Sequence, residues 1–313
     1  MPVNRPSSIN EGISFRGWCE YEPANNVLYC LWNEGFFSNC TVTLFGLIHL
    51  FNDYRIIPDR IDFSRAFSLY RDAIQVERKT DLYPQYFQTH PEVPLGERFS
   101  FKALGYHDSY RFQNILPIAP FINRFFQLAP SIESIESGLI SKYQIDYSNT
   151  LGVCYRGSEK KTEVVLADPR RLIELTERLL DSNSGLRVWI QTEVRQISDL
   201  FLKHFGQRCF AVEELPLIDE NQSTKAMFSD DEGATRRFAF GQNLLAVTHM
   251  LSQCGWLVNH TGNMAYWIWL FRGNSDRMWQ FDRRGKIVSW RTPIRELWDR
   301  SRSFYYYRIA GNK

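Results

Sequence analysis

The sequence lacks the features that mark membrane-spanning, secreted and metal-binding chains. Its most apolar run, residues 42–51, is ten residues long, about half of the roughly twenty that cross a bilayer. The first fifteen residues contain no apolar core of the kind that signal peptides carry. The six cysteines show no C-x-x-C pair and no zinc-finger spacing, so we expect buried free thiols. These absences predict no membrane span, no metal site and a cytoplasmic location.

The sequence also lacks an excess of either charge. Its 37 basic residues nearly cancel its 35 acidic ones, leaving a net charge of +2, which does not favour a general polyanion binder. A local exception is residues 272–308, where nine arginines alternate with aromatic residues. This segment is compatible with stacking on single-stranded nucleic acid or with a tail helix that returns to the N-terminal half. We expect the helix, and no nucleic-acid partner.

What is present is the composition of a globular chain with a large core. Hydrophobic residues make up 44% and aromatic residues 15% of the 313 positions, enough for one large domain or two ordinary ones. The pattern of the sequence changes near residue 148. The first half is irregular, with a loop-like stretch over residues 80–108 that holds three prolines and is compatible with a long active-site loop.

The second half alternates between strand-like and helix-like segments. A helix is expected from Pro130, and another opens at Asp168-Pro169. Strands are expected at residues 150–157, 186–192, 209–215 and 256–260, and further helices at 193–205, 240–254 and 263–271. Parallel strands need crossover connections of this length. The pattern predicts a Rossmann-like domain over about 148–290, with helices on both faces of a parallel sheet.

Ligands of such sheets sit beyond the carboxyl ends of the strands. The polar residues at these ends are Arg156, Thr192, Glu193, His260 and Thr261. The Arg156 guanidinium suits phosphate recognition, although an ion pair with a neighbouring glutamate is an alternative.

The turn Thr261-Gly262-Asn263 opens a helix. Such a turn can bind an anion or can simply cap the helix.

The order of these pieces resembles the donor-binding half of the fucosyltransferase superfamily with the GT-B fold. The superfamily pattern V-H-x-R-x-x-D-K is similar to the segment at residues 153–160, A-T-D is similar to Thr192-Glu193, and L-S-x-x-x-x-L-V-x-T-x-S-S is similar to residues 251–263. Residues 34–39 look like a degenerate form of its G-G-x-G-N element. The resemblance implies an α/β, GT-B-like fold, with two Rossmann-like domains facing a cleft. The acceptor-side domain would span residues 1–147 and the donor-binding domain residues 148–313.

The resemblance also implies a function and a set of site residues. The chain would be a glycosyltransferase, an inverting, metal-independent fucosyltransferase that moves fucose from GDP-fucose to a glycan acceptor. Arg156 would hold the β-phosphate, and Glu34 is the candidate base. The implied donor-binding residues are Gly35, Phe36, Asn39, Cys154, Glu159, Lys160, Thr192, Glu193, His249, Thr261, Gly262 and Asn263. Two alternatives are a transferase that uses another nucleotide-sugar and a catalytically silent glycan-binding or scaffold protein that kept the fold.

Overall fold

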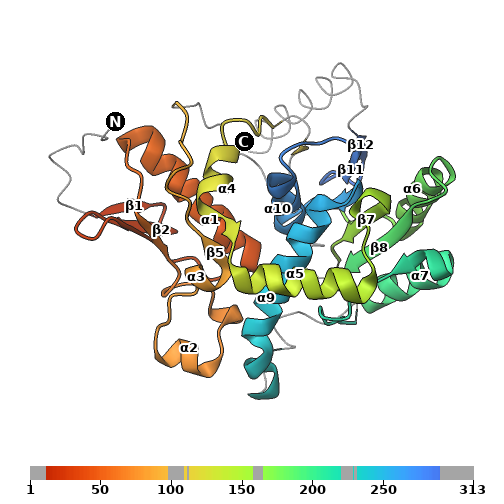
Figure 1. Ribbon diagram of the computed structural model, residues 1–313, viewed down its shortest axis with the longest axis horizontal. Coiled ribbons are helices and arrows are strands. Elements are labelled where there is room, and N and C mark those ends of the chain that lie inside the picture. The colour runs from red at the N-terminus through yellow and green to blue at the C-terminus, as the bar shows by residue number, and fades with distance from the viewer. Residues whose placement is uncertain are drawn as a thin grey trace, which may run out of the picture.

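The structure is a computed structural model, and it describes residues 12–97, 109–110, 113–157, 165–219, 228 and 231–289. It is a mixed α/β protein. Figure 1 shows a parallel sheet with its helices on the right and a smaller sheet at the left, and the long helices α5 (Pro130–Tyr143) and α9 (Asp231–Gln253) run between them. In the described part of the chain, no helix is long and apolar enough to cross a membrane.

The larger sheet has six strands in the order β12-β11-β10-β7-β8-β9. Their bounds are β7 (Thr150–Tyr155), β8 (Arg187–Thr192), β9 (Cys209–Phe210), β10 (Trp256–His260), β11 (Met278–Phe281) and β12 (Ile287–Ser289). The first five in chain order are parallel, and β12 is antiparallel. The chain builds outward from β7 to β9 and then returns to place β10 on the other side of β7. The switch point of the sheet therefore lies between β7 and β10.

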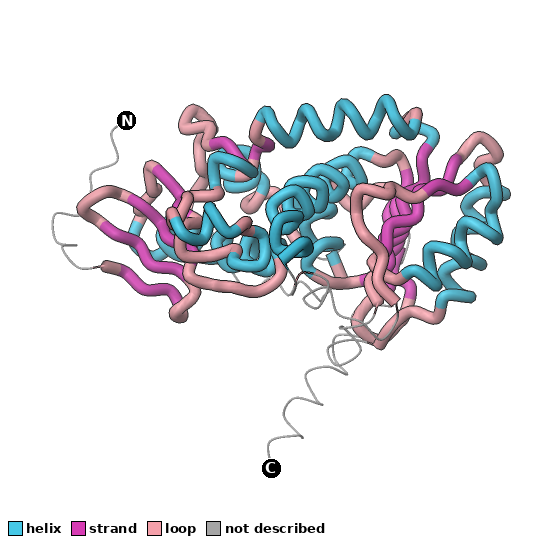
Figure 2. The backbone as a smooth tube through the Cα atoms, turned by 90° about the horizontal axis from the view of Figure 1, so that it is seen from below, coloured by secondary structure: helices cyan, strands magenta, loops and turns pink. Residues whose placement is uncertain are grey.

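Helices cover both faces of this sheet, as the alternation predicted. Alternate strand residues point to opposite faces, and they enter two separate apolar clusters. One face packs on α6 (Pro169–Asp181) and α7 (Arg195–Phe205), and the other packs on α9 and α10 (Asn263–Arg272). Figure 2 shows the sheet nearly edge-on with helices on either side.

Three boundaries differ from the prediction. Strand β9 ends at Phe210 because the chain turns there, and the following Glu214 pairs with Lys142 and Tyr143 of α5. Helix α9 begins at Asp231, nine residues before the predicted start at residue 240; acidic residues favour a helix start because they complement its dipole. The third difference is that β11 and β12 lie within the arginine-rich segment 272–308, where a tail helix was expected. The rest of that segment, from residue 290 on, lies outside the described residues.

The N-terminal half holds one parallel β-α-β unit. Strands β1 (Ile13–Phe15), β2 (Cys19–Glu22) and β3 (Val27–Cys30) are antiparallel, whereas β4 (Arg60–Asp62) is parallel to β3. Between β3 and β4 runs α1 (Phe36–His49), which continues as a π-helical turn (Leu50–Tyr54). The helix expected at 42–51 is thus confirmed, and it begins six residues earlier.

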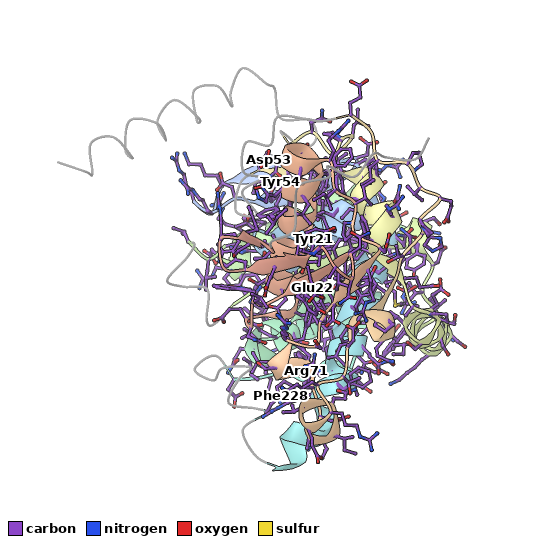
Figure 3. All side chains as sticks on the ribbon, turned by 90° about the vertical axis from the view of Figure 1, so that its left-hand side faces the viewer. Tyr21, Glu22, Asp53, Tyr54, Arg71 and Phe228 are labelled. Carbon is purple, nitrogen blue, oxygen red and sulfur yellow. The ribbon has the colours of Figure 1, made fainter. Side chains whose placement is uncertain are left out.

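Short elements complete this half. They are a 3-10 turn (Ser68–Tyr70), α2 (Ala73–Glu77), α3 (Tyr83–Tyr86), β5 (Phe87–Gln88), α4 (Ala119–Phe125) and β6 (Gln127–Leu128). The stretch 80–108, predicted as a loop, includes α3 and β5, and its residues 98–108 lie outside the described part. The buried Arg71 donates to the backbone carbonyls of Phe63 and Ala66, fixing the irregular path there. Figure 3 shows Arg71 near the base and Tyr21 and Glu22 on β2 above it.

One apolar cluster runs through both halves. It joins residues of α1 and the N-terminal sheet to α9, α10 and one face of the large sheet. Helix α9 crosses the aromatic side chains of the first half closely: a Cβ at Gly241 would lie 2.6 Å from the Tyr86 hydroxyl. The boundary at residues 147/148, and the arrangement as two facing domains, stay predictions.

All six cysteines are buried free thiols, as expected from their spacing.

Candidate functional site

The candidate site lies at the carboxyl ends of β7 and β10. Strand β7 pairs in parallel with β10, with Cys154 opposite Asn259, so the register continued by two residues brings Arg156 opposite Thr261. These two strands flank the point where the strand order reverses. Open parallel sheets bind their ligands in the crevice at such a point. The structure therefore brings together two candidates that are 105 positions apart in the chain.

Arg156 is partly buried at this edge. Its Nε atom is buried and has no hydrogen-bond partner among the described residues. Its Cδ atom lies 3.7 Å from the position that a Cβ atom at Gly262 would occupy, so the side chain leans toward the start of α10. A buried cationic donor without a partner is costly unless a ligand supplies one.

Gly262 forms the turn from β10 into α10. Its φ of 152° and ψ of 173° belong to a region that only glycine adopts easily. The Gly262 amide donates to the Tyr110 hydroxyl over 3.2 Å, and this hydroxyl donates to the Gly262 carbonyl over 3.1 Å. Tyr110 thus fixes the turn from a segment of the first half. The turn aims the positive end of the α10 dipole at the same edge as Arg156.

The neighbours of Gly262 are less available than the sequence suggested. The Thr261 side chain is buried, and its amide donates to the Phe281 carbonyl over 3.0 Å. The Asn263 side chain is also buried, and its Oδ1 accepts from Thr41 Oγ1 of α1 over 3.3 Å. Thr41 Oγ1 in turn accepts from Trp267 Nε1 over 3.0 Å. The Asn263 side chain therefore ties α10 to α1.

Below Arg156, a row of buried polar side chains crosses the sheet. Gln191, Cys154, Asn259 and Gln280 are register partners on β8, β7, β10 and β11, on the face that packs against α9 and α10. Gln280 Oε1 accepts from the Tyr110 amide over 2.9 Å. Within the described residues, Gln191 Oε1 and both amide atoms of Asn259 have no partner.

We name these four residues the polar row. Cys154 in this row is an inert thiol, because burial raises its pKa to about 12. The sequence motifs point to Cys154 but not to Gln191, Asn259 or Gln280. The signal for these three is a polar residue at the same register of neighbouring strands, which becomes visible only once the pairing is known.

Thr192 and Glu193 lie at the neighbouring strand end. Thr192 is buried, and its Oγ1 accepts from the Val194 amide over 3.1 Å, which shapes the entry into α7. Glu193 is partly exposed, and its charge contributes to the raised pKa of Cys154. A Cβ at Gly157 would lie 2.5 Å from a Val194 methyl group, so glycine is needed where the end of β7 passes α7. Both predicted residues are therefore beside the Arg156 edge.

Among the described residues, one predicted site residue of the second half, His249, is not brought to this edge. Glu159 and Lys160 lie outside the described residues. His249 sits one turn before the end of α9, which leads into the amino end of β10, so it lies toward the opposite edge of the sheet. Its Nδ1 is 2.8 Å from Glu136 Oε1 of α5, and its ring packs edge-on against Phe271. His249 joins helices in this structure.

The predicted residues of the first half cluster at the start of α1. Gly35 is the N-cap, and the exposed Glu34 donates its amide to Asn39 Oδ1 over 3.0 Å. Asn39 Nδ2 is buried and has no partner among the described residues. Phe36 is buried, and four aromatic rings lie within about 5 Å of its own, among them Tyr70 and Tyr86. Phe36 is therefore a core residue, whereas Asn39 keeps an unused polar group.

His260 belongs to the opposite face of β10. Its Nε2 accepts from the Ala167 amide over 3.1 Å, and burial lowers its pKa, so the ring is neutral near pH 7. It supports the loop before α6. Among the described residues, no group of three or more His, Cys, Asp or Glu side chains is placed to hold a metal ion.

Comparisons with known proteins give structural likenesses alone. No family model matches the chain, and no curated protein matches its sequence. Among solved structures, the NodZ α-1,6-fucosyltransferase co-crystallised with GDP is 14% identical and aligns over 55% of this chain and 50% of its own, with a TM-score of 0.38. The fucosyltransferase NodZ from Bradyrhizobium is also 14% identical, over 55% and 51%, with a TM-score of 0.35.

POFUT1 in complex with GDP-fucose is 9% identical and aligns over 51% of this chain and 46% of its own, with a TM-score of 0.32. This chain thus spans about half the length of each of these structures. The two NodZ proteins are fucosyltransferases, the class of protein that the sequence motifs resemble. Likenesses this distant assign no activity to the chain.

Proposed function

We propose that this chain is a glycosyltransferase that binds a nucleotide-sugar at the carboxyl ends of β7 and β10. The donor is GDP-fucose, the acceptor is a glycan, and the reaction inverts the anomeric centre without a metal ion. The single observation that carries the proposal is the buried Nε of Arg156, which has no partner among the described residues and lies at the switch point of the sheet beside the N-terminus of α10. This arrangement suits a diphosphate, because a guanidinium and a helix N-terminus both favour anions.

In this proposal Arg156 binds the β-phosphate and the oxygen that leaves with it. Negative charge builds up on that oxygen as the bond to the sugar breaks, so a fixed cation stabilises the transition state more than the ground state. Arginine and the helix dipole would then supply the stabilisation that a divalent cation gives in other transferases. Thr192 and Glu193 would lie along the nucleotide, and Glu159 and Lys160, which follow Gly157 in the sequence, would contribute to the same site.

The transfer itself is a direct displacement. An acceptor hydroxyl oxygen forms a bond to C1 of fucose, the bond from C1 to the β-phosphate oxygen breaks, and GDP leaves with that electron pair. The acceptor proton passes to a carboxylate. We assign that role to Glu34, which is exposed at the start of α1. Glu34→Gln should lower turnover at least tenfold, since general-base catalysis typically contributes that much or more, and should leave GDP affinity unchanged; an unchanged turnover removes Glu34 from the mechanism.

Calorimetric titration tests the donor site. GDP, UDP and ADP are titrated into the wild type and Arg156→Ala, first without metal and then with Mg²⁺. We expect metal-independent binding of GDP, weakened in Arg156→Ala by about 1.5–3 kcal/mol, the usual worth of charged hydrogen bonds. The matched control is Arg195→Ala, because Arg195 begins α7 at the same edge but is half exposed and 3.6 Å from Asp219.

Each outcome separates the alternatives. A preference for UDP keeps the transferase and changes the donor. Equal losses in Arg156→Ala and Arg195→Ala would show a general charge effect and would remove Arg156 from the site. If the wild type binds no nucleotide, the proposal fails, and a silent glycan-binding or scaffold protein becomes the better account.

A further inference from the structure

The feature that the proposed donor site leaves unexplained is Asn259 in the polar row. Its side chain is completely buried, with 0% exposure, and neither its Oδ1 nor its Nδ2 has a partner among the described residues. Burying an amide without hydrogen bonds costs about 1–3 kcal/mol as judged from protein mutants. A valine or leucine would pack at this position of β10 without that cost. A group this costly calls for an explanation.

The explanation lies two residues along the neighbouring strand. Asn259 is opposite Cys154, so Arg156 lies on the same face and about 6.6 Å farther along the strand direction. Within the part of the chain that the structure describes, Arg156 Nε is a buried donor without an acceptor, and Asn259 Oδ1 is a buried acceptor without a donor. The two unused groups are chemically complementary.

The direction of the Arg156 side chain selects Asn259 over Gln191. Both amides are register partners of Cys154, on opposite sides of β7. The Arg156 Cδ lies close to Gly262, which follows β10, so the side chain leans to the β10 side. Gln191 lies on the β8 side of β7, away from the direction in which the Arg156 side chain points.

We propose that Asn259 is a positioning residue for Arg156, an inference that rests on the proposed donor site. When the diphosphate binds, Asn259 Oδ1 accepts the Arg156 Nε–H, directly or through one water molecule. This bond fixes the rotation of the guanidinium, so that its two terminal nitrogens face the β-phosphate as a fork. Asn259 does not contact the donor. Without the donor, the buried Asn259 amide has no partner among the described residues, which lowers stability. On this proposal the amide is kept because it becomes paired when the donor binds.

Two nearly isosteric variants test this inference. Asn259→Val and Asn259→Thr both suit a buried strand, and they differ by one acceptor oxygen. The measurements are the Kd values of GDP and of GMP, which lacks the β-phosphate, together with the melting temperature. We expect Asn259→Val to weaken GDP about tenfold and GMP hardly at all, with a melting temperature equal to or above that of the wild type. Asn259→Thr should keep most of the GDP affinity.

A double-mutant cycle shows whether Asn259 acts through Arg156. In the Arg156→Ala background, Asn259→Val should change the GDP affinity less than twofold. The control is Gln191→Met in the same row: because Gln191 lies on the β8 side of β7, away from Arg156, this variant should leave the ratio of GDP to GMP affinity unchanged.

Several results would overturn the inference. Equal GDP affinity in Asn259→Val, Asn259→Thr and the wild type would show that the acceptor oxygen has no role. An equal loss with and without Arg156 would show that Asn259 acts elsewhere. A lower melting temperature in Asn259→Val, with no change in the GDP to GMP ratio, would make the amide structural. Wild type that binds no GDP refutes the proposed function itself, and the positioning role falls with it.

Discussion

The two faces of the large sheet are built from alternate residues of the same strands, yet they differ in chemistry. The face toward α6 and α7 is formed by Leu151, Val153, Val188, Ile190 and Val258, all buried in one apolar cluster. The opposite face carries the polar row, whose Gln191 and Asn259 have orphaned amide atoms in the described structure. Alternate side chains of one strand can thus enter an apolar core on one face and leave buried polar groups on the other.

The difference in chemistry between the two faces follows from the structural elements that each face meets. The α6/α7 face is closed by amphipathic helices whose leucines fill it, such as Leu172 and Leu179. The α9/α10 face ends at Gly262, where the chain leaves the sheet beside Arg156. Polar groups cost stability in a core, and their gathering beneath this edge is consistent with the ligand site that we propose there.

The largest expected effect is a loss of stability on the apolar face of the sheet. Ile190→Ala removes a buried side chain from the apolar face and should lower the free energy of unfolding by about 2–5 kcal/mol. The adjacent Gln191→Met, on the polar face, should cost far less, since Gln191 Oε1 has no partner in the described residues to lose. Urea unfolding measures both. If Gln191→Met is as costly as Ile190→Ala, the contrast between the faces is wrong.

A smaller loss is expected at the turn that ends the polar face. Gly262→Ala places a Cβ on a backbone with φ of 152° and 3.7 Å from the Arg156 Cδ. The strained backbone should cost about 1–3 kcal/mol of stability. GDP affinity should fall too, because the turn aims α10 at Arg156. The control is Gly185→Ala, where a Cβ meets nothing within 4 Å. Unchanged stability and GDP affinity would show that the turn tolerates side chains.

The smallest effect concerns His260, the buried imidazole of the apolar face. Its pKa is lowered by burial, so below its ordinary value of about 6.5 the unfolded chain takes up a proton that the folded chain refuses. Stability is therefore full above that pH and falls as the pH drops toward the folded pKa. His260→Gln, which retains an acceptor, should show a smaller loss between pH 7.5 and 5.5 in urea unfolding. Equal losses in both proteins would show that His260 does not contribute.

Much of the second half could be predicted because its signals are local. Apolar strands such as residues 186–192 and the proline-started helices α5 and α6 follow from residue type and spacing, and they form where expected. Strand β11 could not be found in this way. Its sequence MWQF lies among arginines, and its strand character comes from pairing with β10, which no local pattern shows.

The candidate site could be predicted only in part, because some of its residues have a local signal in the sequence and others do not. Arg156 and Gly262 follow strands, so a rule about strand ends finds them. Asn259 and Gln191 lie inside strands, and their alignment with Cys154 depends on register and on strand order. His249 was carried in by the motif, and its bond to Glu136 belongs to the tertiary packing of α9 on α5.

The most direct test is a crystal structure of the protein with GDP. It should show the β-phosphate within hydrogen-bond distance of the Arg156 guanidinium, between the carboxyl ends of β7 and β10 and beside the first turn of α10, with Asn259 Oδ1 turned toward Arg156 Nε. A nucleotide bound at another place, or Arg156 paired to a carboxylate with no ligand at this edge, would contradict the account.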